Sequence, residues 1–451
     1  MWMVRMAEAG VRRPERGARD VLVTGMGFCL PGGTAAAPLF TAEEIWDVAA
    51  NGRSCIVSGG IYHGRVDLTE AMFDERFPEL PSLYTSGLTR AHRFGLVSFA
   101  EACADGKLDF RAGDLTEAAV LVGRGGLDDN IDPYIALRDA EPEQMAATAA
   151  TALFIRAQLG ITSYDVTLLQ ASLARSTGPS FTVSCGCSSS TVQLGIALRM
   201  IATGEVDVAV VTGVDAFSMD IMRNAQRLLF AAKRGGPQPG ADTLPETLPS
   251  MDRPMRPYDV RADCVNFGEG SVTVVLESRQ HAEQRGAHIY GQLLAQATTR
   301  DGLASPLSLD DSGAALVAAV RSCLGDRWSV DQIPYVNGGS DGDMNVTMTE
   351  SNAIRELYGP AVPAVLLSSQ EACFGHSGAQ SGNLGLALTL LMMEKSQVCP
   401  TANCEQPVDF LSFDPIPGTR PRPLDFDHAL SFTYQIGGLK SVVLMSSADA
   451  C

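Results

Sequence analysis

Apolar residues follow two alternating patterns along the chain. Short runs dominated by Val, Ile and Leu have the length and composition of buried strands, as at residues 21–27, 118–126 and 205–216. Between these runs lie longer segments in which apolar residues recur every three or four positions, as at residues 42–51 and 89–104. The alternation of strand and helix predicts an α/β fold in which helices cover buried strands.

The alternation is interrupted between residues 233 and 257, which are rich in Pro and Gly and therefore break regular structure. It resumes beyond them and continues to residue 445. We therefore predict two α/β halves, residues 20–255 and residues 256–451. The first 19 residues are dotted with Arg and lack the apolar core of a signal peptide, so we expect a flexible tail there.

The most informative segment is residues 178–204, GPSFTVSCGCSSSTVQLGIALRMIATG. A β-branched run, a turn of small residues and a long apolar stretch predict strand, tight turn and helix, with the serines 188–190 as N-capping hydroxyls. Cys187 then lies at the first turn of the helix, where free backbone N–H groups and the helix dipole stabilise a thiolate. Cys187 is the candidate nucleophile; a buried structural cysteine is the alternative.

Composition narrows the possible functions. The 451 residues are 45% hydrophobic, contain no apolar run of eighteen, and carry a net charge of −18, which argues against a membrane span and against nucleic acid as a partner. Eleven cysteines without framework spacing indicate reduced thiols in a cytoplasmic protein, and no metal site is expected. An acidic partner would need a local basic patch, for which the candidates are Arg223, Arg227, Lys233 and Arg234.

Residues 178–190 resemble the active-site segment of β-ketoacyl synthases, in the thiolase-like superfamily. The resemblance runs from about residue 20 to 446 through GMGFCLPGG (25–33), RPYDVRADCVNFGEG (256–270), SSQEACFGHSGAQSG (368–382), PTANCEQP (400–407) and SFTYQIGGLKSVVL (431–444). It implies a duplicated thiolase-like fold of five α-β-α-β-α layers, and a dimer. The duplication is not visible in residue identities.

The resemblance assigns Cys187 as the nucleophile, although Ser184, Cys185 and Gly186 replace the family's Asp-Thr-Ala before it. His376 matches the second family histidine and is the expected base. Gly339, within YVNGGSDGDMNVTMTE (335–350), occupies the place of the first family histidine. The same segment has the first ligand spacing of a calcium loop, but its later positions do not fit.

Two further departures concern the surroundings of the base and the acyl group. The family lysine five residues before the histidine is Glu371, which either faces the site and orients His376 or points to solvent. Near the end of the chain, Gln435 and Ile436 replace a hinge glycine and a gating phenylalanine. By analogy, the backbone N–H groups of Cys187 and Ile436 are the expected oxyanion donors.

We therefore expect a ketosynthase-like acyltransferase of polyketide or fatty-acid biosynthesis. It would take an acyl group from the phosphopantetheine arm of an acyl carrier protein onto Cys187, bind no cofactor of its own, and act without malonyl decarboxylation, like the family's non-elongating members. One alternative is decarboxylative condensation with a rearranged site. Another is a non-catalytic partner subunit of the chain-length-factor kind. Such subunits typically lack the nucleophilic cysteine, so the presence of Cys187 counts against this alternative. The dimer would be formed with a second copy or with another ketosynthase-like subunit.

Overall fold

The computed structural model describes residues 19–33, 37–80, 85, 87–125, 131–160, 165–234, 250–303, 308–359 and 365–450. Residues 1–18 of the predicted tail lie outside this part of the chain. Its last residue, Arg19, is attached to the body of the protein: its backbone N–H donates to the Ala202 carbonyl oxygen at 3.2 Å, and its guanidinium pairs with Asp207. Arg19 therefore belongs to the folded body of the protein and not to the predicted tail.

Ten strands form one sheet built from two topologically equivalent sets of five. The first set is β1 (Val21–Cys29), β4 (Ala119–Arg124), β5 (Ser180–Val183), β6 (Val208–Asp215) and β7 (Gly270–Ser278). The second set is β8 (Gly291–Arg300), β9 (Tyr335–Asn337), β10 (Leu366–Ser368), β13 (His428–Gln435) and β14 (Leu439–Ser447). The sheet order is β10-β9-β13-β14-β8-β1-β7-β6-β4-β5, and the two sets meet through the β1–β8 pairs Leu22–Gln292 and Val23–Gly291.

Each set has the same spatial order when its strands are numbered from its own start, namely third, second, fourth, fifth, first. In each set the third, second and fourth strands run parallel, and the fourth, fifth and first run antiparallel. The duplication that residue identities did not reveal is therefore present in the topology.

The boundary between the halves lies later than the predicted 255/256. Strand β7 pairs with β6 and β1 along its length, so it completes the first set, and the division falls between Ser278 and Gly291. The prediction was wrong because a Pro- and Gly-rich segment marks a break in regular structure, and here that break lies inside the first half, before its last strand.

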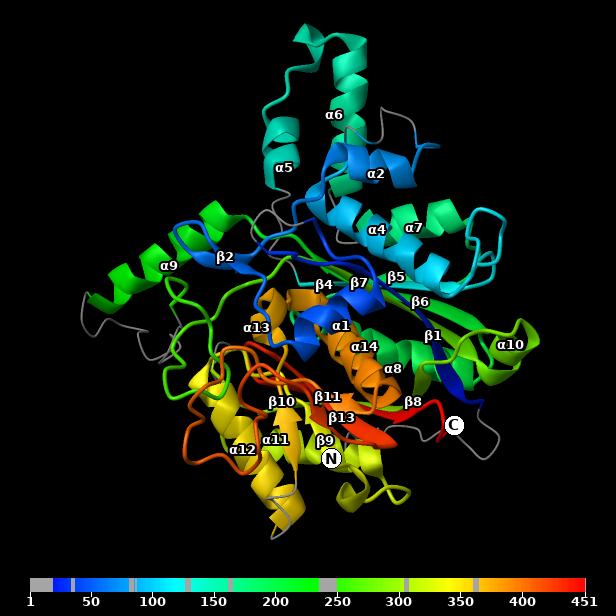
Figure 1. Ribbon diagram of the computed structural model, residues 1–451. Helices are drawn as coiled ribbons and strands as arrows, with labels where there is room; N and C mark the ends of the chain where they lie inside the picture. Colours follow the sequence, from blue (N-terminus) through cyan, green and yellow to red (C-terminus); the bar gives the residue numbers. More distant parts are fainter. Residues whose placement is uncertain are drawn as a thin grey trace, which may run out of the picture.

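The helices complete five layers (Figure 1). Helices α4 (Arg90–Asp105) and α7 (Asp165–Ala174) cover the outer face of the first set, and α11 (Ala314–Leu324), with α12 (Met344–Tyr358) beside it, covers the second. Helices α8 (Ser189–Ala202) and α14 (Ser381–Glu394) contact each other and strands of both sets. Because α14 packs against strands of both sets, thirteen of its fourteen residues are buried and it has no polar face. The predicted five-layer architecture is confirmed.

The remaining elements lie outside these layers, except for the buried α13. The helices are α1 (Ala42–Ala50), α2 (Glu70–Arg76), α5 (Ile131–Arg138), α6 (Ala147–Gly160), α9 (Met219–Arg234), α10 (Arg279–Gln284) and the short α13 (Glu371–Phe374). Two small sheets pair β2 (Ile56–Ser58) with β3 (Tyr62–Gly64) and β11 (Gln397–Val398) with β12 (Arg422–Pro423). The predicted helices at 42–51 and 89–104 correspond to α1 and α4, which begin at capping boxes on Thr41 and Thr89. None of the helices within the described ranges combines the length and apolarity that crossing a membrane requires.

The candidate site residues all follow the carboxyl ends of strands. Cys187 follows β5, Gly339 follows β9, Glu371 and His376 follow β10, and Ile436 follows β13. Parallel strands end at a common edge, where loops can converge on one place without disturbing the core. The fold therefore brings together residues that are up to 249 positions apart in the chain (Cys187 to Ile436).

Candidate active site

The turn that carries Cys187 is held by hydrogen bonds to a serine. Strand β5 ends at Val183 and α8 begins at Ser189, as the strand-turn-helix pattern predicted. The Cys185 backbone N–H donates to Ser189 Oγ at 2.9 Å, and that oxygen lies 2.6 Å from the Gly186 carbonyl oxygen. Ser188 is the N-cap residue but makes no side-chain capping bond, so the prediction that a serine hydroxyl caps this helix is wrong. Ser189 holds the preceding turn instead.

Cys187, His376 and Glu371 form a continuous chain of contacts. The Cys187 Sγ lies 2.9 Å from His376 Nε2, and His376 Nδ1 lies 3.0 Å from Glu371 Oε2. The side chains of His376 and Glu371 are only 12% and 10% exposed, so water screens their interaction weakly. Glu371 therefore faces the site; the alternative that it points to solvent is excluded.

The geometry of Glu371 is fixed by its place in the short helix α13. Its backbone N–H donates to Ser369 Oγ at 3.2 Å, and its Oε2 accepts the Ser377 backbone N–H at 3.2 Å as well as facing His376. One carboxylate oxygen thus holds both the imidazole and the backbone that follows it. Such a third group fixes the orientation of the base and supports its positive charge.

The electrostatic balance favours a charged imidazole. Burial by itself lowers the pKa of His376, but Cys187 and Glu371 on its two sides outweigh burial and hold that pKa well above 6.5. An imidazolium within 2.9 Å of Sγ stabilises the thiolate, which is the nucleophilic form of cysteine. For Cys185, two residues away, no neighbouring charge offsets burial, which raises the pKa of its thiol. The geometry thus favours Cys187 as the nucleophile.

The ring of Tyr434 fills the space beside Gly339, the position at which the family has its first histidine. A Cβ at Gly339 would lie 2.9 Å from the Phe432 carbonyl oxygen and 3.0 Å from two ring carbons of Tyr434. Tyr434 itself donates to Glu350 Oε1 at 2.9 Å, and Glu350 also accepts the Tyr258 hydroxyl at 2.6 Å and the Gly339 N–H at 2.8 Å. Any side chain at Gly339 therefore requires Tyr434 to move.

Glu350 and Tyr434 were not among the residues expected from the sequence. Complete burial raises the pKa of Glu350 to about 7, although its hydrogen bonds oppose the shift. Tyr434 lies in the segment 431–444 that resembles the family, yet nothing in that segment indicates a contact with residue 339. Only the pairing of β13 beside β9 brings the two together.

A cavity of about 480 Å³ adjoins the candidate nucleophile and base. Most of its walls are apolar, from Phe217, Met222, Met251, Val265, Phe267, Leu309, Val346 and Ile436. Its acidic residues are Asp215, Asp341 and Asp343, and no Lys or Arg occurs among the described residues that line it. Such a cavity suits an apolar group that enters beside a reactive thiol.

Asp341 adds negative charge close to the base. Its Oδ2 lies 3.6 Å from His376 Nδ1, and the Asp343 backbone N–H donates to its Oδ1 at 3.0 Å. Burial, together with Asp341, raises the pKa of Asp343 to about 6. The sequence segment 340–345 that shares the spacing of a calcium loop thus supplies an acidic wall to the cavity. Among the residues the structure describes, no group of three or more His, Cys, Asp or Glu is placed to hold a metal ion.

The expected oxyanion donors both border the cavity. Ile436 lies in the β13–β14 turn with 49% of its surface exposed, and Cys187 lies opposite in the nucleophile turn. The two turns touch, since a Cβ on Gly186 would lie 2.4 Å from Gln435 Cγ. Gly186 has a φ of +54°, which only glycine adopts without strain. The convergence of the two backbone N–H groups on one oxygen stays a prediction.

Comparisons with known proteins agree with this architecture. Residues 18–282 match the family model "Beta-ketoacyl synthase, N-terminal domain", and residues 290–405 match "Beta-ketoacyl synthase, C-terminal domain". A relative is the 3-oxoacyl-[acyl-carrier-protein] synthase 2 of Vibrio harveyi, 27% identical over 437 aligned residues that cover 93% of this chain and 96% of the relative.

Two solved structures share the fold. One is a type II polyketide synthase acyl-carrier protein in complex with its ketosynthase bound to the hexaketide, with a TM-score of 0.75, 21% identity, and coverage of 96% of this chain and 100% of that chain. The other is the ishigamide ketosynthase/chain length factor, with a TM-score of 0.73, 21% identity, and coverage of 95% and 99%. The two family models together cover most of the chain, which is therefore a member of the β-ketoacyl synthase family.

Proposed function

We propose that this protein transfers an acyl group from an acyl carrier protein to a nucleophilic acceptor through a thioester on Cys187, without decarboxylating malonyl carrier. The observation that carries the proposal is the contact chain Cys187–His376–Glu371 beside a glycine at position 339. The chain supplies a nucleophile, a base and an orienting carboxylate. The glycine supplies no side-chain donor for an enolate.

In the loading step, the Cys187 thiolate attacks the carbonyl carbon of the carrier thioester and forms the new C–S bond. The bond to the pantetheine sulfur breaks, and that sulfur takes the proton of the His376 imidazolium as it leaves. In the transfer step, neutral His376 removes the proton from the acceptor, whose heteroatom attacks the acyl carbon while the Cys187 sulfur leaves. The backbone N–H groups of Cys187 and Ile436 would stabilise the oxyanion in both steps.

Decarboxylation places different demands on the site. It leaves an enolate whose oxygen requires preformed donors, and the loss of one such donor costs ~10²–10³-fold in rate. Tyr434 occupies the space beside Gly339 but directs its hydroxyl to Glu350. Asp341 and Glu371 add negative charge that opposes both the malonyl carboxylate and the enolate. Acyl transfer to an oxygen, nitrogen or sulfur nucleophile forms no enolate and avoids these costs.

The partners follow from the chemistry. The phosphopantetheine arm would arrive on a carrier protein, so the protein needs no cofactor of its own. Helix α9 carries Arg223 and Arg227 on the segment whose Met222 lines the cavity, which offers an acidic carrier a place to dock. We further propose a dimer, either of two copies or with another ketosynthase-like subunit, and a cytoplasmic location in keeping with the free cysteines of the described chain.

Decarboxylative condensation is the main rival function, because the relatives include the 3-oxoacyl-[acyl-carrier-protein] synthase 2 of Vibrio harveyi. The deciding experiment measures two products from one enzyme: acyl-enzyme by intact mass spectrometry after incubation with acyl carrier, and labelled CO₂ from malonyl carrier with and without prior acylation. We expect acyl-enzyme without CO₂ release. Release at the rate of an ordinary condensing ketosynthase would overturn the proposal in favour of condensation, and failure to load any acyl group would favour a non-catalytic partner subunit.

A further inference from the structure

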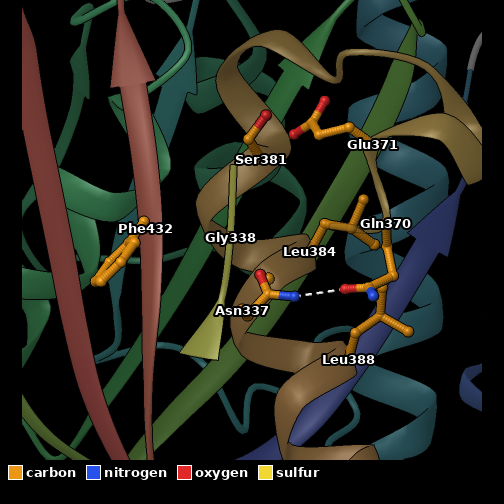
Figure 2. Close-up of a pocket in the computed structure, with 9 residues that line it drawn as sticks. Asn337, Gly338, Gln370, Glu371, Ser381, Leu384, Leu388 and Phe432 are labelled. Atoms are coloured by element: carbon orange, nitrogen blue, oxygen red, sulfur yellow. Dashed lines mark hydrogen bonds between the residues drawn. The ribbon is translucent and has the colours of Figure 1, made fainter. Parts of the chain in front are cut away.

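A second, much smaller cavity is lined in part by Glu371, the carboxylate that faces His376. Its volume is about 20 Å³, and its walls include Glu371, Ser381, Gly338, Gln370 and the apolar side chains of Leu384, Leu388 and Phe432 (Figure 2). A buried space holds a water molecule when it offers roughly 10–15 Å³ and at least two polar partners. The volume therefore suits one water molecule and is too small for a substrate.

Ser381 provides the first polar partner. It is the first residue of α14 and only 7% exposed, and its Oγ is buried without any hydrogen-bond partner. A buried hydroxyl left unsatisfied is unfavourable, so an unpaired one beside a cavity requires an explanation. The side chain extends toward the carboxylate of Glu371 in Figure 2, yet no direct hydrogen bond joins them.

Glu371 provides the second partner. Both described hydrogen bonds to its carboxylate, from His376 and from the Ser377 backbone, end on Oε2. The neighbouring amides are already engaged. Asn337 Nδ2 donates to Gln370 Oε1 (Figure 2), and Gln370 Nε2 donates to Ser368 Oγ. A donor in the cavity would therefore meet Glu371 on one side and Ser381 on the other.

We infer that this cavity binds one structural water, which accepts a hydrogen bond from the Ser381 hydroxyl and donates one to the free oxygen of the Glu371 carboxylate. Ser381 is then a positioning residue that acts on His376 through the water and Glu371. A hydrogen bond to the charged form of a carboxylate stabilises that form, and groups of this kind behind a functional site fix the orientation of the residues in front. The inference rests on the proposed role of Glu371 as the partner of His376.

The test compares Ser381→Ala with Ser412→Ala, a matched removal of a buried serine hydroxyl that lines neither cavity and accepts a hydrogen bond from Ser351 Oγ at 3.2 Å. The readout is the rate of Cys187 alkylation by iodoacetamide as a function of pH, which reports the thiolate and does not depend on acyl transfer. A mainly structural role for Ser381 would lower stability in both variants without moving the pH profile.

We expect Ser381→Ala to slow alkylation at neutral pH about two- to tenfold and to move the midpoint of the profile to higher pH, because Glu371 supports the imidazolium less well. Ser412→Ala should leave the profile unchanged. A crystal structure of the wild-type protein at high resolution should show one water between Ser381 and Glu371, and it decides the matter if Ser381→Ala fails to fold. An empty cavity, or a profile that Ser381→Ala does not move, would overturn the inference. Normal alkylation with no acyl loading would instead count against the proposed function alone.

Discussion

The two halves of the protein place their reactive residues at the same topological position but build it differently. In each set of five strands, the third strand is followed by a central helix: β5 leads to α8, and β10 leads to α14. Only residues 184–188 separate β5 from α8, whereas residues 369–380 separate β10 from α14 and include the short helix α13.

The short junction, residues 184–188, holds one reactive group, and the long junction, residues 369–380, holds two. Five residues are enough to present Cys187 at the start of a helix, and the turn is closed by Ser189. Twelve residues allow Glu371 to fold back onto His376 while both side chains stay about nine-tenths shielded from water. The duplicated fold thus places the proposed nucleophile at one junction and the proposed base with its carboxylate at the other, and Cys187 Sγ lies 2.9 Å from His376 Nε2.

Removal of the nucleophile has the largest expected effect. Cys187→Ala should abolish the acyl adduct seen by intact mass spectrometry, because no other thiol contacts His376 in the described structure. Cys185→Ala should keep most of the loading, since Cys185 is a neutral half-buried thiol. Loading that persists in Cys187→Ala and vanishes in Cys185→Ala would show that Cys185 is the nucleophile.

Removal of the base comes next. His376→Ala should slow transfer to the acceptor by about 10²–10⁴-fold, the usual contribution of a positioned general base. Loading should fall by a smaller factor, because the N-terminus of α8 still supports the Cys187 thiolate. Single-turnover measurements of the two steps separate these effects. Equal losses in the loading and transfer steps would mean that His376 mainly activates Cys187.

Removal of the charge on the orienting carboxylate has an intermediate effect. Glu371→Gln keeps the shape of the side chain but lets the pKa of His376 fall, because one of the groups that hold it up is lost. Less imidazolium at pH 7 means less thiolate, so the pH midpoint of Cys187 alkylation should rise, with about tenfold slower alkylation for each unit. Glu394→Gln, at the far end of α14, controls for the change in net charge. An unchanged pH midpoint would show that Glu371 does not support the charge of His376.

The smallest effect concerns the short junction itself. Ser189→Ala removes the oxygen that accepts the Cys185 N–H, and should lower the free energy of unfolding by about 1–3 kcal/mol. Ser188→Ala removes a hydroxyl that makes no capping bond and only accepts from Thr433 at 3.3 Å, so about 1 kcal/mol or less is expected. Urea unfolding of the two variants measures the difference, and the reverse order would restore the capping role to Ser188.

The sequence predicted the short junction better than the long one. A β-branched run, small residues and an apolar stretch are local signals, and they correctly indicated strand, turn and helix around Cys187. The side on which Glu371 lies depends on the backbone of α13 and on its bonds with Ser369 and Ser377, so a spacing of five residues could not decide it. Tyr434 lies 95 positions from Gly339 in the chain, and only the sheet brings them into contact. Local composition also placed the boundary of the halves too early, because the boundary is defined by strand pairing and not by the Pro- and Gly-rich segment.

The repeated strand order has a consequence for how the two junctions depend on each other. Each set of strands pairs within itself, and among the described strands the two sets pair only between β1 and β8. The two central helices are in contact as well, and the Asn383 backbone N–H of α14 donates to Ser190 Oγ of α8 at 3.2 Å. A change in the length of the junction after β10 would therefore be transmitted to the start of α8 through this helix contact and not through the register of the sheet.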